Sequence, residues 1–374
     1  MRARSYFSAR GYVMPTQINP AEYLLELINT DFIREEDSTA QVAHIHDAWA
    51  WSRESQAVKV AIDASITSGN DREYHGANLS VMRDKRPNTF VVVLALLHRS
   101  WIKSYRDVVT YGIRIAMYLG LAIMMGTVFL RLSTSQKDIQ PFVNAIFFGS
   151  AFMSFMAVAY VPAFLEDHAT FAKERANGLC GPLAFTIANF LIGLPYLFLI
   201  AILFSVITYW LIAFQPTAGA FWLWVLWLFL DLLAAESLVV LVSSLLPIFV
   251  VALAITAFAN GLWMCVGGFL VPLPTLNVFW KYVFHYIDYQ AYVFQGMLVN
   301  ELQHRTYDCA GSAEKGWQCM YDSDLASVGK IRGTAVLEAF NYRTGLEGTW
   351  IGIMIGIIAG YRILGWLVLV MKKT

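Results

Sequence analysis

The sequence predicts an all-α integral membrane protein with six transmembrane helices, an interfacial connecting helix and a helical exoplasmic cap. Its 374 residues are 57% hydrophobic and only 14% charged, whereas soluble domains average about 25% charged residues. Residues 142–165 and 179–214 contain no Asp, Glu, Lys or Arg. Each run exceeds the roughly 20 apolar residues that a helix needs to cross a bilayer. These two observations favour a membrane protein over a soluble one.

Residues 1–86 are polar and read as a cytosolic linker segment with little material for a core of its own. A proline at the first helical position predicts a short helix beginning at Pro20. Leu24, Leu27 and Ile28 share one face of it and need a packing partner. A weaker amphipathic helix follows over residues 37–68, and residues 69–87 have the composition of a loose linker.

Residues 87–106 are expected to form the interfacial connecting helix. From His98 to Arg106 the sequence alternates bases with Trp101 and Tyr105, a pattern that suits a helix lying in the headgroup plane. Binding of nucleic acid by these bases finds no support elsewhere, since the chain has 27 basic and 27 acidic residues. We therefore expect membrane lipid, and no nucleic acid, as a partner.

Six spans follow, five of them in residues 107–271 and the sixth in residues 349–374 together with a cytosolic tail. Turn signals at Gln215-Pro216 and Leu246-Pro247 separate spans three, four and five. Residues 272–348, between spans five and six, are expected to form re-entrant helices and the cap loop. The predicted spans are residues 107–130, 142–165, 182–213, 221–245, 248–271 and 349–371.

The distribution of bases predicts the orientation of the chain in its membrane, either the plasma membrane or an endomembrane. Bases precede span one, lie between spans two and three, and follow span six, all on one side. By the positive-inside rule, both termini and the charged segment of residues 166–178 are then cytosolic. This segment is expected to be an exposed turn, either a plain solvated loop or a docking surface. The absence of an apolar stretch in the first residues indicates no signal peptide.

The cap carries two cysteines, Cys309 and Cys319, ten positions apart on the face expected to be oxidising. A disulfide between them is expected there. No metal is expected, because His44 and His46 lack a nearby third ligand. Two His and Asp pairs in the cap could suggest acyl transfer, but no nucleophile or cofactor motif accompanies them.

Three ionisable residues, Arg114, Glu236 and Arg362, fall at similar depth in spans one, four and six, at a rise of about 1.5 Å per residue. Intramembrane charges are costly and are usually paired or functional. We expect Glu236 to pair with one of the two arginines; the alternative is that an arginine snorkels to the interface. Asp231, higher on span four, has no evident partner in the sequence.

Several separated motifs occur along the chain in this order: YFSARGYVMPTQINPAEYLLELINTDF, FAKERANGLCGPLAF, Leu194-Pro195, FWKYVFHYIDYQAYVFQGMLVNEL and GYRILGWLVL. They resemble the G subfamily of ATP-binding cassette transporters, the white and pleiotropic-drug-resistance group, in its half-transporter form. The resemblance implies an ABC-2 type, type V exporter-like membrane domain. It also implies a nucleotide-binding domain and a dimer with a second half-transporter, identical or different.

The chain departs from this family in one respect. It contains no G-x-x-x-x-G-K-[ST] phosphate loop, whose glycines, lysine and hydroxyl hold phosphates and magnesium. We therefore expect no enzymatic activity, no catalytic residue and no cofactor in this chain. ATP and magnesium would bind a nucleotide-binding domain elsewhere. Since the resemblance starts where that domain ends, we expect Met1 to be an internal methionine of a longer transporter or the start of a truncated product.

The resemblance also implies site residues. Within residues 166–178 it implies a coupling helix that transmits ATP-driven motion, and on spans two and five a substrate cavity closed by an apolar plug. Lipid contact or helix packing is the alternative for each aromatic. The expected coupling residues are Phe171, Lys173, Glu174 and Arg175; the cavity residues are Phe155, Asn260, Trp263 and Met264; and the plug residues are Phe269 and Leu270.

The function implied is efflux of amphipathic, lipid-like or xenobiotic molecules by alternating access. ATP hydrolysis outside this chain would drive it. The alternative is a truncated membrane scaffold that does not transport, or a dominant partner of intact half-transporters.

Overall fold

The computed structural model describes residues 6–15, 18–28, 35–74, 88–312 and 316–372. The chain divides into two compact units, Met1–Arg86 and Pro87–Thr374. The predicted linker helix lies in the first unit as α2 (Pro20–Ile28), followed by α3 (Glu35–Ala50) and α4 (Arg53–Tyr74). Where one amphipathic helix was expected, two helices meet at Ser52, whose hydroxyl accepts a hydrogen bond from the Ser55 amide. The helix α4 also covers the start of the expected loose linker, and residues 75–87 lie outside the described part of the chain.

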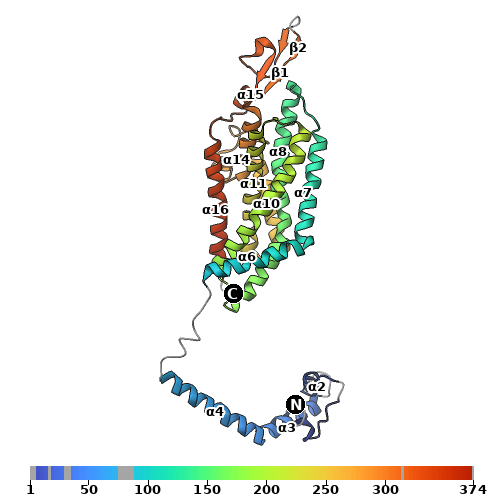
Figure 1. Cartoon of the computed structure of the whole chain (residues 1–374), viewed down its shortest axis with the longest axis vertical. Helices are drawn as coiled ribbons and strands as arrows, with labels where there is room; N and C mark the ends of the chain where they lie inside the picture. The colour runs from blue at the N-terminus through green and yellow to red at the C-terminus, as the bar shows by residue number, and fades with distance from the viewer. Residues whose placement is uncertain (1–5, 16–17, 29–34, 75–87, 313–315, 373–374) are drawn as a thin grey trace. The chain divides into compact units, whose positions relative to one another are not determined.

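The second unit is the membrane domain (Figure 1). Within the described residues, six helices are long and apolar enough to cross a membrane. The predicted all-α fold with six spans is therefore confirmed. The spanning helices are α7 (Val108–Val128), α8 (Ile139–Met156) with α9 (Val161–Ala176), α10 (Pro182–Ile212), α11 (Ala218–Leu245), α12 (Phe249–Val266) and α16 (Glu347–Met371).

Helix α11 forms the centre of the bundle. In its apolar window, 83% of the residues are buried, against 28–67% for the other five spans. It packs against α16, α10, α8 and α12. Two fully buried indoles, Trp224 and Trp227, fill the space around it. A helix that is apolar on every side is typical of such a central position.

Helix α6 (Thr89–Arg106) runs across one end of the bundle, close to where the C-terminus lies (Figure 1). Asn88 caps it by accepting a hydrogen bond from the Phe90 amide. Val93 and Leu96 are buried against the bundle, whereas Trp101 and Tyr105 are exposed. The helix therefore has one face on protein and an exposed face that carries aromatic rings.

The second span is longer than predicted, and its charged end is helical. A 3-10 turn at Ala157–Tyr160 interrupts it before α9 begins. Pro162 explains the break, because proline has no amide hydrogen to donate and its ring clashes with the preceding turn. Helix α9 then continues through the charged residues to Ala176, and the chain reverses at Gly178, where φ is +72°. The expectation of an exposed turn over residues 166–178 was therefore wrong for most of that segment.

The fifth span ends at Val266 instead of residue 271. Gly268 has φ of +97°, a conformation that side chains disfavour and that helices do not contain. The chain leaves the helix at this point and presents Phe269 to the bundle, where its ring stacks on Phe147 with centroids 4.1 Å apart. The two consecutive glycines thus end the fifth span and begin a turn.

Between α12 and α16, the described residues form helices and four short strands. It begins with α13 (Val278–Trp280) and a π-helical turn at Lys281–His285, and α14 (Tyr289–Leu302) packs deep against α11 and α8. The strands β1 (Thr306–Asp308) and β4 (Lys330–Arg332) pair antiparallel, as do β2 (Ala310–Ser312) and β3 (Gly316–Gln318). A 3-10 turn at Ala326–Val328 and α15 (Gly333–Ala339) complete the cap. The sequence predicts a mostly helical cap and does not reveal these strands, since three residues are too few to show an alternating pattern.

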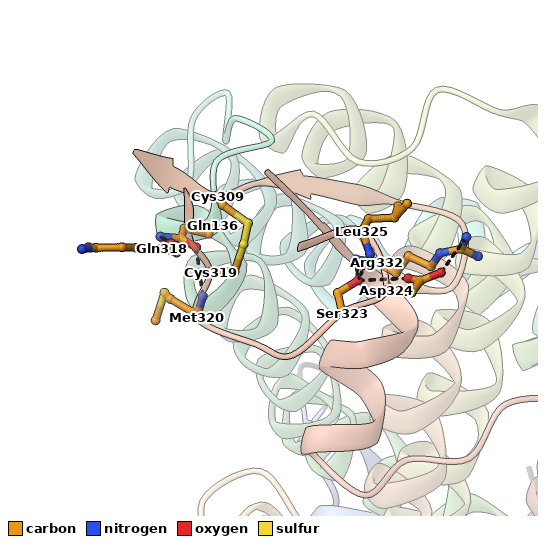
Figure 2. The surroundings of a disulfide bond; sticks show 9 residues. All are labelled: Gln136, Cys309, Gln318, Cys319, Met320, Ser323, Asp324, Leu325 and Arg332. Atoms are coloured by element: carbon orange, nitrogen blue, oxygen red, sulfur yellow. Dashed lines mark hydrogen bonds and ion pairs between the residues drawn. A yellow bond between two sulfur atoms is a disulfide. The ribbon is translucent and has the colours of Figure 1, made fainter. Parts of the chain in front are cut away.

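A disulfide joins Cys309 and Cys319 in the cap (Figure 2). Gln136, in the loop between α7 and α8, lies beside it. Its side-chain amide donates a hydrogen bond to the carbonyl of Gln318 and accepts one from the amide of Met320, both at 3.1 Å. The cross-linked loop is thereby fastened to the end of the first helical hairpin.

Candidate coupling surface and intramembrane charge cluster

Charged side chains of α9 and α6 face each other at one end of the bundle. Arg99 on α6 forms an ion pair with Glu174 on α9. Lys103 contacts Asp167 at 2.9 Å and Glu166 at 3.3 Å. Burial alone would lower the pKa of Lys103, but these two carboxylates outweigh it and raise the pKa, so Lys103 stays cationic. Ion pairs therefore hold α9 against the interfacial helix.

Two of the other expected coupling residues fasten α9 to two spans. Phe171 is buried and stacks on Phe185 of α10, with ring centroids 4.4 Å apart. The Arg175 guanidinium donates to the carbonyls of Leu369 and Val370 near the end of α16. Lys173 is exposed. The sequence did not indicate these partners, because they lie between 14 and 195 positions away along the chain.

Glu236 lies between two arginines inside the bundle. Its Oε2 is 3.0 Å from an Arg114 nitrogen, and its Oε1 is 4.0 Å from an Arg362 nitrogen. All three residues are at least nine-tenths buried. We call Arg114, Glu236 and Arg362 the charge cluster. It joins α7, α11 and α16, three spans whose sequence positions are far apart.

Neutral polar groups complete the charge cluster. Arg362 donates to Ser237 Oγ and to Asn189 Oδ1, both at 2.9 Å. Asn189 in turn donates to the Tyr160 hydroxyl at 2.8 Å, and the Arg114 guanidinium lies 4.8 Å from the centre of the Tyr160 ring. Two cations share one carboxylate here, so these dipoles and the aromatic ring help to compensate the second positive charge.

A second buried polar chain lies toward the cap. The Ser154 hydroxyl donates to Asp231 Oδ1 at 2.6 Å, which supplies the partner that the sequence did not reveal. Asn260 is fully buried; its Oδ1 accepts hydrogen bonds from the Tyr289 hydroxyl at 2.7 Å and from Gln290 at 3.3 Å. These contacts tie α14 to α12.

The expected cavity and plug residues fall into two groups. Phe155 and Leu270 are exposed in this chain, at 38% and 53%. Asn260 and Trp263 lie on the buried face of α12, and Met264 is half-buried. A groove of about 480 Å³ follows the accessible face of α12 instead, lined by Phe258, Gly261, Leu262, Cys265, Val266, Val271, Leu276 and Trp280.

This arrangement defines a polytopic membrane domain, with a charged helical surface at one end and a disulfide-bonded cap at the other. The ABC-2 type transporter family matches residues 91–302. The chain belongs to this family.

The chain is similar to plant members of the ABC transporter G family. ABC transporter G family member 1 of Petunia hybrida is 30% identical over 308 residues, which cover 80% of this chain and 48% of the relative. Member 11 of Arabidopsis thaliana is 28% identical over 338 residues, covering 84% and 47%, and member 13 is 25% identical over 390 residues, covering 96% and 56%. The chain thus spans about half the length of these relatives.

Proposed function

We propose that this chain is the permease domain of a G-type ABC exporter. It pairs with a second half-transporter, identical or different, and moves amphipathic or lipid-like molecules, xenobiotics included, outward by alternating access. ATP is hydrolysed in a nucleotide-binding domain, in the same polypeptide or a partner, that docks on the cytosolic surface of α9. The observation that supports this most directly is that one charged helix contacts α6, α10 and α16 together.

The contacts of α9 suggest how motion would pass into the membrane. The helix continues the second span through the 3-10 turn at Ala157–Tyr160. Displacement of α9 would pull α10 through the Phe171–Phe185 stack and α16 through Arg175. Lys173, exposed on the same helix, is free to face a docked domain.

For the substrate path, we propose that Phe155 and Leu270 line the space between two protomers. Both are large apolar side chains exposed on a single protomer, as a dimer cavity requires. The stack of Phe269 on Phe147 would form the body of the plug. We assign Asn260 and Trp263 a supporting part, because both are buried inside the protomer, while the partly exposed Met264 borders the path.

The test is substrate-dependent efflux from cells that express the chain fused to, or together with, a nucleotide-binding domain of the G group. We expect Glu174→Arg to reduce efflux about tenfold or more, the scale on which coupling free energies act. Surface expression should be unchanged, because Glu174 lies at the edge of the fold with part of its side chain exposed.

A charge swap separates docking from a merely internal ion pair. In the double variant Arg99→Glu with Glu174→Arg, the pair between α6 and α9 is restored with reversed signs. If Glu174 serves docking, efflux remains low in the double variant. Recovery of efflux in the double variant would show that Glu174 acts only through its ion pair with Arg99. If no substrate is exported by the unmodified chain in this assay, the exporter proposal fails. The alternative of a membrane scaffold that does not transport would then be favoured.

A further inference from the structure

A cavity of about 190 Å³ lies at the end of the bundle where α6, α9 and α10 meet. Two cations of α6, Arg99 and Lys103, stand on one wall, and two acids of α9, Glu166 and Asp167, stand on another. Apolar side chains of α10, among them Ala188, form the floor. The cavity therefore combines paired charges of both signs with an apolar base.

The charges on the cavity walls indicate which class of ligand the cavity would bind. The walls carry two positive and two negative groups, so a bare anion attracted by the cations would also be repelled by the carboxylates. A zwitterion can satisfy both walls at once. Lys103 contacts both carboxylates, and a zwitterion placed between them would replace each contact by one of the same kind.

The depth of the cavity points to the membrane interface. It is lined by Tyr111, the residue at which the apolar window of α7 begins. Trp101 and Tyr105 are exposed on α6, in keeping with the enrichment of Trp and Tyr at the level of lipid headgroups. The floor, with Ala188 and Ile192, belongs to the spanning helix α10. A ligand with a polar head and an apolar body would therefore place its head at the level of the lipid headgroups and its body against α10.

Size limits the ligand further. Pockets for drug-sized molecules measure about 300–1,000 Å³, so 190 Å³ is too small for a whole amphipathic substrate. A cavity of this size suits a small headgroup.

We propose that this cavity binds the zwitterionic headgroup of a phospholipid, with the phosphate on Arg99 and Lys103 and the ammonium on Glu166 and Asp167. The acyl chains leave along α10 into the bilayer. Asn189 lines the same cavity and accepts a hydrogen bond from Arg362 of the charge cluster. The bound headgroup thus touches the coupling surface and the bundle interior together. The site requires only the folded membrane unit and does not depend on the proposed export.

The test is a titration of the purified full chain in detergent with short-chain phosphatidylethanolamine and phosphatidylcholine, followed by thermal unfolding and native mass spectrometry. Phosphatidylglycerol and inorganic phosphate serve as anionic probes. We expect the two zwitterionic lipids to bind and raise the unfolding midpoint, and the two anionic probes to have little effect. Equal binding of phosphatidylglycerol, or displacement by inorganic phosphate, would show a simple anion site and overturn the proposal.

Two variants locate the site. Ala188→Leu fills the floor and should weaken zwitterionic lipid binding about tenfold or more, whereas Ile187→Phe adds bulk at a neighbouring exposed position and should not. Lys103→Gln removes a phosphate partner without filling space and should weaken binding as well. The proposal is overturned if Ala188→Leu and Lys103→Gln, each unfolding at the normal temperature without lipid, still bind the zwitterionic lipids as the unmodified chain does.

Discussion

At the scale of single residues, the charges inside the bundle were the part of the site most accessible to sequence reasoning. Arg114, Glu236 and Arg362 stand out because ionisable residues are rare in apolar runs, and a constant rise per residue gives their depth. Asn189 and Ser237 could not be identified in this way, since small polar residues are common in transmembrane helices. The sequence also suggested one arginine for Glu236, whereas the structure brings both within 4.0 Å.

The charge cluster makes a direct prediction for stability. Glu236→Gln leaves Arg114 and Arg362 buried without their counter-charge, and breaking a buried pair in this manner costs about 3–5 kcal/mol. We expect a lower midpoint of thermal unfolding in detergent and reduced yield. Asp231→Asn is the matched control on the same helix, because its side-chain oxygen still accepts the hydrogen bond from Ser154. Equal midpoints of thermal unfolding for Glu236→Gln and Asp231→Asn would contradict this account.

At the scale of elements, apolar length predicts which segments span the membrane, but ends and breaks depend on local backbone chemistry. Pro162 and Gly268 are visible in the sequence, yet which of the prolines and glycines interrupts a helix depends on packing. The charges of residues 166–176 led to the expectation of an exposed turn there, whereas the family resemblance implied the coupling helix. Those charges are instead paired with α6 and with the end of α16.

The packing of α14 on α11 gives a prediction at this scale. A Cβ atom added at Gly296 would overlap the indole ring of Trp227, which is fully buried and has no room to move. Overpacking of this kind costs about 1–3 kcal/mol, so Gly296→Ala should lower the midpoint of thermal unfolding. Gly356→Ala on α16 is the matched control, because nothing lies within 4 Å of the added atom. Equal midpoints for the two variants would show that α14 does not pack on Trp227 in the protein.

At the scale of the whole molecule, the membrane unit has two chemically different ends. Arg99, Lys103, Arg175 and Lys372 gather at the end that carries α6 and the C-terminus (Figure 1). The other end carries the loop that is closed by the disulfide of Cys309 and Cys319 and held by Gln136. Composition and the positive-inside rule predict that the basic end faces the cytosol, and this orientation stays a prediction. They could not predict the attachment through Gln136, because a single glutamine in a short loop carries no pattern.

This polarity can be tested with single cysteines and a membrane-impermeant maleimide. Val328→Cys places a thiol at a position that is 64% exposed in the cap, and Lys173→Cys places one on the exposed side of α9. In intact cells that carry the chain at the plasma membrane, we expect Val328→Cys to be labelled and Lys173→Cys to be labelled only after permeabilisation. The unmodified chain is the control: Cys180 is buried, and any labelling of the exposed Cys265 is measured there and subtracted. Labelling of Lys173→Cys from outside would place the coupling surface on the wrong face for ATP, and the orientation and the proposed coupling would both have to be abandoned.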